Sequence, residues 1–288
     1  MDRRSFLAAG IALPAVAAIG SRTHLLAEDV TTKGADKLGW KLALQTWTNN
    51  KKSLFDSLEL CKKLGVKYAE CYPGQVLETG KKPAFGPGMS QAEIDATLAK
   101  AKECGVTIIH AGVMGIPGKM EEAVKLFTWA KKIGLTVINS EPDPKDLPVI
   151  DKAAVETDMK VGIHDHPKPS RYWDPEYVIS LVKDLQNVGM CADVGHWVRS
   201  GLNPTEILKK HADQVVSSHF KDMAKGAGPN GYHDVIWTTG MGDVKGMLTA
   251  LKNGDFKGVF SIEFEWEWKE ETLAACVRNF HKTADELA

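Results

Sequence analysis

The 288-residue sequence lacks the features that mark several large classes of proteins. The apolar stretch near its N-terminus, Phe6 to Gly20, is shorter than the roughly 20 apolar residues that a bilayer-spanning helix needs. Lys and Arg together number 36 and Asp and Glu 37, so the formal net charge is −1 and there is no basic excess to attract nucleic acid or an anionic membrane. The composition therefore gives no support for a nucleic-acid partner or a membrane-embedded chain.

Cysteine is scarce and shows no pattern. The five cysteines lie mostly beside apolar residues and without CxxC spacing, at Cys61, Cys71, Cys104, Cys191 and Cys276. An odd, unpatterned set in a chain of this length predicts small buried side chains and not a disulfide framework. We therefore expect no disulfide.

The N-terminus has the pattern of an export signal. Arg3 and Arg4 precede Ser5-Phe6-Leu7 and a run of small and apolar residues, which resembles a twin-arginine signal for proteins exported after folding. An ordinary Sec signal or an uncleaved anchor is the alternative, and cleavage would suit either Ala17 or Ala27. We expect a signal at residues 1–27, a periplasmic or extracytoplasmic location, and no stable membrane insertion after cleavage. Loss of residues 1–27 removes Asp2 and three arginines and moves the formal charge from −1 to −3, which is still close to neutral.

Beyond a polar linker at residues 28–40, short β-rich runs alternate with helical patterns to the end of the chain. This alternation predicts parallel strands joined by helices. The eight predicted strands are Lys41 to Trp47, Val66 to Tyr72, Val106 to Ala111, Leu135 to Ser140, Lys160 to His164, Met190 to Val194, Gln214 to Phe220 and Gly258 to Phe264. Residues 41–288 have the usual length of a (β/α)8 barrel, about 250 residues. We therefore predict a single-domain α/β fold, a (β/α)8 TIM barrel.

The predicted helices carry their own start and stop signals. Ser90 and Glu93 have the spacing of a capping box, and Asp174-Pro175 and Asn203-Pro204 place a capping side chain before a proline. Five helices are expected to end on a glycine in the left-handed conformation, at Gly65, Gly105, Gly134, Gly189 and Gly254. No glycine-rich phosphate turn follows the first strand, which favours a closed barrel over an open Rossmann sheet.

Four polar residues follow apolar strands directly, at the barrel end where such enzymes build their sites. They are Glu141, Asp193, His219 and Glu263. Three carboxylates at one point repel one another, and a divalent cation removes this conflict. Oxygen donors with one nitrogen suit Mn²⁺, Mg²⁺ or Co²⁺, with Zn²⁺ as an alternative. Rim salt bridges or helix caps are the alternative interpretation of each residue taken alone.

Five motifs carry a resemblance to a known family. They are Asn139-Ser140-Glu141-Pro142, Cys191-Ala192-Asp193-Val194-Gly195-His196-Trp197, Ser218-His219-Phe220-Lys221-Asp222, Gly240-Met241-Gly242-Asp243-Val244 and Ser261-Ile262-Glu263. They resemble the xylose isomerase-like barrel superfamily, and within it the sugar phosphate isomerases/epimerases, over residues 41 to 285. The resemblance implies that Glu141, Asp193, His219 and Glu263 bind one metal ion. It further implies that Glu141 and Glu263 act as acid and base, and that His196 contacts a substrate hydroxyl. Relatives often pair through the barrel rim, so a homo-oligomer stays open.

Several further residues are candidates for the substrate pocket, each with a structural alternative. They are His164, His166, Lys221, Glu70, His110 and Trp47. The two histidines end the fifth strand, and one of them could instead be satisfied by the loop backbone. Lys221 shares the inward parity of His219 and either stabilises an enolate or pairs with Glu263 or Glu265. Glu70 and His110 are equally compatible with structural hydrogen bonding, and Trp47 with packing.

These residues predict an isomerase or epimerase that removes a proton next to a carbonyl of a free sugar or sugar derivative, through an enediolate. A base must reach the proton while positive charge meets the developing oxyanion. The alternative is a 3-keto-glycoside lyase or hydratase on the same metal site. An endonuclease IV-type DNA repair enzyme is disfavoured by the near-neutral charge, and a non-catalytic sugar-binding protein by the intact set of ligands.

Overall fold

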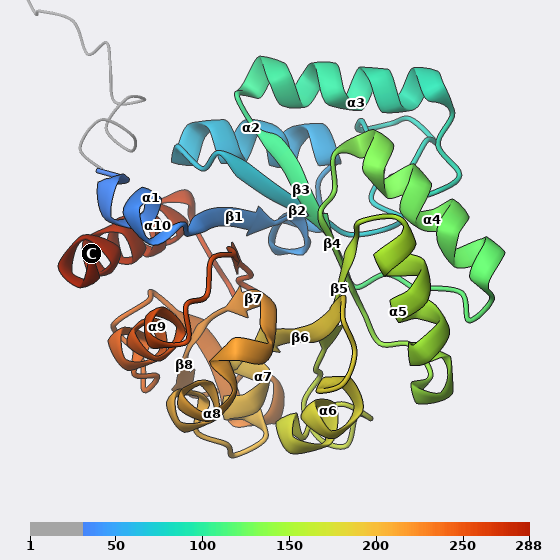
Figure 1. Ribbon diagram of the computed structural model, residues 1–288. Coiled ribbons are helices and arrows are strands. Elements are labelled where there is room, and N and C mark those ends of the chain that lie inside the picture. The colour runs from blue at the N-terminus through green and yellow to red at the C-terminus, as the bar shows by residue number, and fades with distance from the viewer. Residues whose placement is uncertain (1–30) are drawn as a thin grey trace, which may run out of the picture.

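A closed barrel of parallel strands forms the centre of the molecule (Figure 1). The computed structural model describes residues 31–288, so the predicted export signal lies outside the described residues. The barrel strands are β1 (Lys41–Gln45), β2 (Tyr68–Cys71), β3 (Thr107–Ala111), β4 (Val137–Ser140), β5 (Lys160–His164), β6 (Val188–Asp193), β7 (Val215–Phe220) and β10 (Val259–Ile262). Their order around the barrel is β1-β10-β7-β6-β5-β4-β3-β2. The predicted single-domain (β/α)8 barrel is confirmed, and each observed strand overlaps its predicted run.

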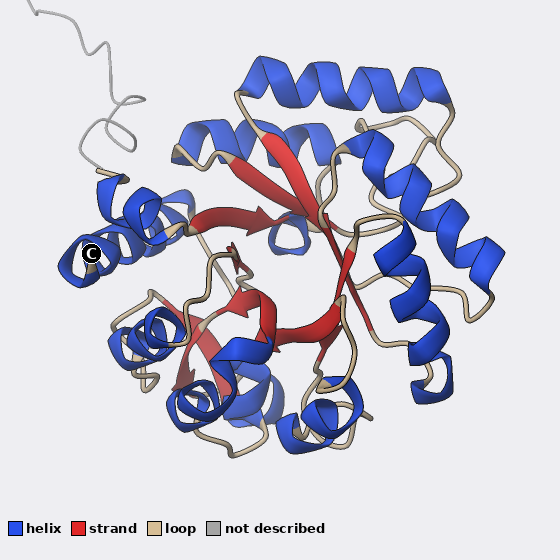
Figure 2. Ribbon diagram, in the orientation of Figure 1, coloured by secondary structure: helices blue, strands red, loops and turns tan. Residues whose placement is uncertain are grey.

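Helices surround the ring of strands (Figure 2). They are α2 (Leu54–Leu64), α3 (Gln91–Cys104), α4 (Met120–Ile133), α5 (Leu147–Glu156), α6 (Pro175–Val182), α7 (Val194–Arg199), α8 (Pro204–His211), α9 (Val244–Asn253) and α10 (Glu270–Leu287). Short 3₁₀ turns lie at Thr46–Asn49, Pro144–Asp146, Ala212–Gln214 and Pro229–Gly231. Each long helix buries one apolar stripe, as Leu58, Phe127 and Phe280 illustrate, because that stripe must leave water to stabilise the fold.

The cysteines lie in the interior of the protein. All five cysteines are buried and unpaired, which fits their expected role as small apolar side chains. Within residues 31–288, no helix combines the length and hydropathy that a membrane crossing requires.

Most of the predicted helix ends are observed. Ser90 and Glu93 form a capping box, and Asp174 and Asn203 cap the helices that begin with proline. The helices α2, α3 and α4 end on left-handed glycines, at Gly65, Gly105 and Gly134.

Of the other two predicted glycine ends, Gly189 was wrong, whereas Gly254 caps α9 but without the left-handed conformation. Gly189 lies inside β6, where a Cβ atom would meet the Gln214 carbonyl oxygen at 2.6 Å, so close strand approach requires this glycine. Gly254 follows α9 but has a φ of −84°, and the positive φ falls on Asp255 instead. The left-handed residue after α9 is therefore one position later than the pattern placed it.

Two elements add to the barrel without a sequence signal. Helix α1 (Lys33–Leu38) lies within the stretch expected as a polar linker and packs beside α10, where the Gly34 N–H donates to Asp285 Oδ1 at 2.7 Å. An antiparallel hairpin, β8 (Asp222–Lys225) and β9 (Tyr232–Val235), follows β7. The hairpin buries Asp234, which is 3% exposed, and so brings a carboxylate toward the open end of the barrel.

Candidate metal and substrate site

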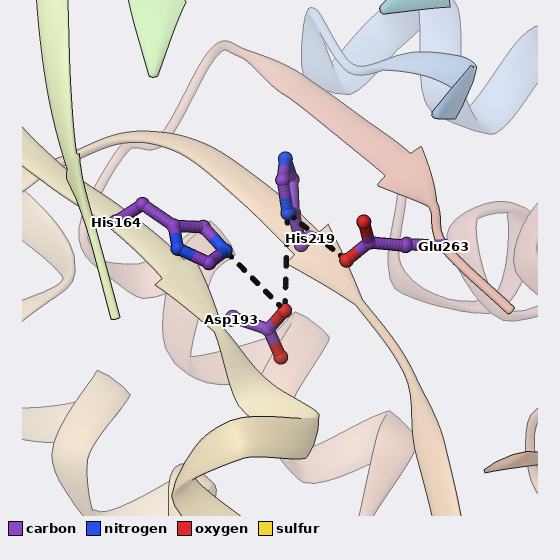
Figure 3. A group of neighbouring side chains, drawn as sticks. All are labelled: His164, Asp193, His219 and Glu263. Atoms are coloured by element: carbon purple, nitrogen blue, oxygen red, sulfur yellow. Dashed lines mark ion pairs between the residues drawn. The ribbon is translucent and has the colours of Figure 1, made fainter. Parts of the chain in front are cut away.

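Four side chains converge at the C-terminal ends of four adjacent strands. His164 ends β5, Asp193 ends β6, His219 lies on β7 and Glu263 follows β10 (Figure 3). His219 Nδ1 lies 3.1 Å from Glu263 Oε2 and 3.8 Å from Asp193 Oδ2, and His164 Nε2 lies 3.7 Å from the same Asp193 oxygen. One donor atom from each residue lies within 4.8 Å of all the others, and all four residues are buried. We call these residues the four-residue cluster.

The donor atoms of the four-residue cluster fit a divalent metal ion. His164 Nε2 and His219 Nδ1 are buried and have no hydrogen-bond partner, although a buried polar atom normally has one. Both nitrogens face carboxylate oxygens, so a cation between them would satisfy all four groups. Two nitrogen and two oxygen donors suit Mn²⁺, Co²⁺ or Zn²⁺ better than Mg²⁺, which prefers oxygen.

The structure brings together three of the four ligands that the sequence predicted. Asp193, His219 and Glu263 belong to the cluster, but Glu141 does not. Glu141 Oε1 instead accepts a hydrogen bond from His164 Nδ1 at 2.9 Å and also contacts Nδ1 of His166. His164, which the sequence assigned to the substrate pocket, thus fills the fourth position, and Glu141 lies on the far side of its ring. Glu141 as a direct ligand stays a prediction.

A second buried carboxylate orients His219. The His219 Nε2–H donates to Glu70 Oε1 at 2.9 Å, and Asn139 and Ser261 donate to the same carboxylate at 2.7 and 2.5 Å. Burial alone would raise the pKa of Glu70, but the facing His219, the nearby His110 and the hydrogen bond from Ser261 lower it to about 2. His219 and His164 therefore each hold one ring nitrogen on a carboxylate and leave the other free, as metal-binding histidines do.

Glu70 and His110 lie deeper than the substrate pocket that the sequence assigned to them. Their exposed fractions are 0% and 1%, and neither lines the cavity described below. Burial lowers the pKa of His110 to about 4, so its ring is neutral beside the Glu70 carboxylate at neutral pH. Their buried position favours a role in structural hydrogen bonding, and not in substrate binding, for both residues.

We expect Glu70→Gln to weaken metal binding about 10- to 100-fold, because the group that orients a ligand histidine is lost. It should also lower the free energy of unfolding by about 3 kcal/mol, since a buried ionic contact loses its charge. Metal titration and urea unfolding would measure the two effects. Glu78→Gln is the matched control, because Glu78 lies on the surface beside Lys81. Equal metal affinity in both variants would contradict the orienting role.

Lys221 supplies a fixed positive charge next to the cluster. Its ammonium lies 2.8 Å from Asp193 Oδ2, 2.7 Å from Glu263 Oε2 and 3.0 Å from Glu265 Oε2. Although burial lowers it, these carboxylates hold the pKa of Lys221 well above its usual value. A Cβ atom on residue 195 would lie 2.6 Å from Lys221 Cδ, so Gly195 makes room for this side chain. Of the two roles open for Lys221, the structure favours pairing with Glu263 and Glu265.

The sequence analysis missed a buried network around Arg199. One guanidinium nitrogen, Nη1, lies 2.6 Å from Glu265 Oε2 and 3.1 Å from His196 Nδ1, and Nη2 lies 3.3 Å from Asp234 Oδ2. Burial raises the pKa of Asp234 to about 6, whereas the pKa of Glu265 is lowered because Lys221 and Arg199 outweigh its burial. An arginine within the apolar sequence around Trp197 was a signal for such a site. Asp234 gave none, because the hairpin was not predicted.

A cavity of about 280 Å³ opens beside the cluster. Its walls include Trp47, Tyr72, His164, His166, His196 and Glu263. Trp47 is 43% exposed and meets Tyr72 edge to face, with ring centroids 5.0 Å apart, so one wall is flat and aromatic. The other wall carries imidazoles and carboxylates, and within residues 31–288 no lysine or arginine lines the cavity. The cavity therefore offers an apolar surface opposite hydrogen-bonding groups.

Comparison with known proteins agrees with this fold. Residues 145–283 match the family model "Xylose isomerase-like TIM barrel". A crystal structure of an uncharacterised protein from Parabacteroides distasonis is 29% identical, with a TM-score of 0.69 over 85% of this chain and 99% of that one. No curated protein matches the chain. The fold is therefore that of a xylose isomerase-like TIM barrel.

Two more distant structures carry names that bear on activity. A D-tagatose 3-epimerase-like protein is 19% identical, with a TM-score of 0.64 over 86% of this chain and 97% of that one. A sugar phosphate isomerase/epimerase from Parabacteroides distasonis is 16% identical, with a TM-score of 0.58 over 85% and 94%. At these identities the likeness establishes the shared fold.

Proposed function

We propose that the protein is a divalent-metal-dependent isomerase or epimerase that moves a proton on the carbon next to a carbonyl of a sugar. The observation that carries this proposal is the pair of unpartnered imidazole nitrogens that face Asp193 and Glu263 at the mouth of the barrel. The sugar isomerases and epimerases that share the fold support it. A metal ion bound there would stabilise negative charge on a substrate oxygen.

Glu263 and Glu141 are the proposed acid and base. Glu263 follows β10 and Glu141 follows β4, and three strands separate β10 from β4 in either direction around the barrel. The two carboxylates therefore belong to opposite walls of the barrel: Glu263 lines the cavity, and Glu141 contacts His164 and His166, which line it. If one removes a proton from a carbon and the other returns it on the opposite face, that carbon is inverted. Return by the same group to the adjacent carbon gives an isomer.

His166 lies between Glu141 and solvent. The side chain of His166 is 50% exposed and its Nδ1 contacts Glu141 Oε1. Although burial raises it, hydrogen bonds from His164 and His166 lower the pKa of Glu141 to about 2, so Glu141 is ionised at neutral pH. Glu141 can therefore accept a proton from a substrate carbon, while the Nδ1–H of His166 holds its carboxylate in place.

The charges around the cavity favour an unphosphorylated sugar. Glu263 and Glu265 line the cavity without any lysine or arginine. The two nearest cations, Lys221 and Arg199, are already paired with carboxylates. A phosphate dianion would meet like charge there, and phosphate sites in proteins normally offer unpaired donors. An exported protein, as the N-terminal sequence predicts, would also meet free sugars more readily than sugar phosphates.

The proposal is tested by incubating metal-loaded protein with free ketoses and 3-keto-glycosides in D₂O. We expect deuterium uptake at a carbon next to the carbonyl, and a product with the mass of the substrate apart from the exchanged deuterium. The same incubation without protein, and with protein stripped of metal, provides the controls. Loss of a group from the substrate would indicate a lyase or hydratase instead. Absence of uptake, with no bound metal in elemental analysis, would overturn the proposal.

A further inference from the structure

Arg199 has contacts that define the chemical form of His196. Its side chain is 3% exposed and lies at the C-terminal end of α7, one turn beyond His196. Its Nη1 lies 3.1 Å from His196 Nδ1. A guanidinium can only donate hydrogen bonds, so His196 Nδ1 must be the acceptor and carry no proton.

The other ring nitrogen of His196 then carries the proton. Nε2 lies 3.5 Å from Asp193 Oδ2, and His196 lines the cavity. The ring is also held in place from its face, because His166 stacks on it with centroids 5.2 Å apart and an interplanar angle of 28°. The Nε2–H of His196 therefore lies beside the Asp193 carboxylate at the edge of the cavity, and the ring has no free acceptor.

We propose that Arg199 is a positioning residue that fixes His196 as the neutral Nε2–H tautomer, so that His196 donates a hydrogen bond to a carbonyl or hydroxyl oxygen of the substrate. The substrate oxygen at this position is an acceptor. Arg199 itself does not line the cavity, and it acts through His196 and Glu265.

The hairpin of β8 and β9 keeps Arg199 in this position. Asp234 on β9 lies 3.3 Å from Arg199 Nη2 and also accepts the Glu265 backbone N–H at 3.2 Å. One guanidinium thus joins three segments that are distant in sequence: α7, the hairpin and the loop after β10. Loss of Asp234 would free the guanidinium to move away from His196, because Glu265 would be its one remaining carboxylate partner.

Nitrogen-15 NMR of the zinc-loaded protein tests the tautomer directly and does not depend on any substrate. We expect His196 Nδ1 to give the shift of an unprotonated, pyridine-type nitrogen and Nε2 that of a protonated, pyrrole-type nitrogen. A spectrum of His196→Gln assigns the two signals. In Arg199→Met the opposite tautomer should become populated. A proton on Nδ1 in the unmodified protein, or the same single tautomer in Arg199→Met, would overturn the proposal.

Kinetics test the role in substrate recognition and rest on the proposed function. We expect Arg199→Met to lower kcat/KM about 10- to 100-fold, the usual effect of losing a group that orients an active-site imidazole. Asp234→Asn should show the same change to a smaller degree. Arg278→Met is the matched control, because Arg278 is exposed on α10. An unchanged kcat/KM in Arg199→Met would overturn this role.

The two measurements separate the possible failures. If Arg199→Met does not fold, Arg199→Lys keeps the charge without the planar group of donors and serves the same comparison. If no substrate of the panel reacts, the NMR result still decides the tautomer. If His196 has the proposed tautomer but no substrate of the panel reacts, the result counts against the proposed function and not against the positioning of His196 by Arg199.

Discussion

Glu263→Gln is expected to reduce deuterium uptake by the substrate on the order of 10⁴-fold, because it removes both the proposed acid–base group and a proposed metal ligand. Glu263 Oε2 lies 3.1 Å from His219 Nδ1 and 2.7 Å from Lys221 Nζ, so the lost charge also leaves the ammonium with fewer partners. Uptake is measured by proton NMR of the recovered sugar at saturating metal. Saturation separates loss of the acid–base group from a weaker metal site.

Glu267→Gln is the matched control for this experiment. Glu267 lies in the same loop, carries the same charge and is exposed to solvent. It should react like the unmodified protein. A Glu263→Gln variant that stays within about tenfold of the unmodified rate would rule out Glu263 as acid or base, since such groups contribute about 10²–10⁴-fold.

Addition of Mn²⁺, Co²⁺ or Zn²⁺ to protein stripped with a chelator should raise the Tm by roughly 8–16 °C. An ion at about 1,000 times its Kd stabilises the folded state by about 4 kcal/mol, and a domain of this size gains about 2–4 °C per kcal/mol. The unfolded chain binds the ion more weakly, because the residues of the cluster are spread from His164 to Glu263 in sequence. Differential scanning fluorimetry measures the Tm, and elemental analysis measures the metal bound per chain.

His164→Gln and His233→Gln distinguish the cluster from other histidines in this experiment. His164→Gln removes one of the two nitrogen donors and should lose most of the metal-induced rise in Tm. His233 belongs to the hairpin and is not part of the four-residue cluster, so His233→Gln should keep the rise. Equal shifts in the two variants would move the metal site elsewhere.

The fold was predictable because its signals are local. Each barrel strand is a short apolar run between helices whose caps, such as Ser90 and Asn203, are readable from two or three residues. The fact that parallel strand ends meet at one rim then brought Asp193, His219 and Glu263 into one prediction. The place of His164 in the four-residue cluster, with Glu141 on the far side of its ring, was not predictable in this way. Both residues stand at neighbouring strand ends, and the choice depends on side-chain reach and hydrogen bonds that no local pattern specifies.

The Arg199 network depends on contacts that the sequence does not display. The strands of the hairpin are four residues each and mostly polar, so they lack the apolar alternation by which strands are recognised. Without the hairpin, Asp234 has no reason to lie near Arg199 or Glu265. The same limit applies to Glu70, whose partners Asn139, His219 and Ser261 come from three other strands.

The polar layer inside the barrel constrains any redesign of this scaffold. Glu70 joins β2 to β4, β7 and β10 through its three donors, and Asn139 in turn accepts a hydrogen bond from Ser217 on β7 at 2.6 Å. Replacing one of these residues with an apolar side chain leaves its buried hydrogen-bond partners unsatisfied. Each unsatisfied neutral group lowers the free energy of unfolding by about 1–3 kcal/mol. New activities should therefore be sought by changing the aromatic wall around Trp47 and Tyr72, while the interior layer is exchanged as a whole or left intact.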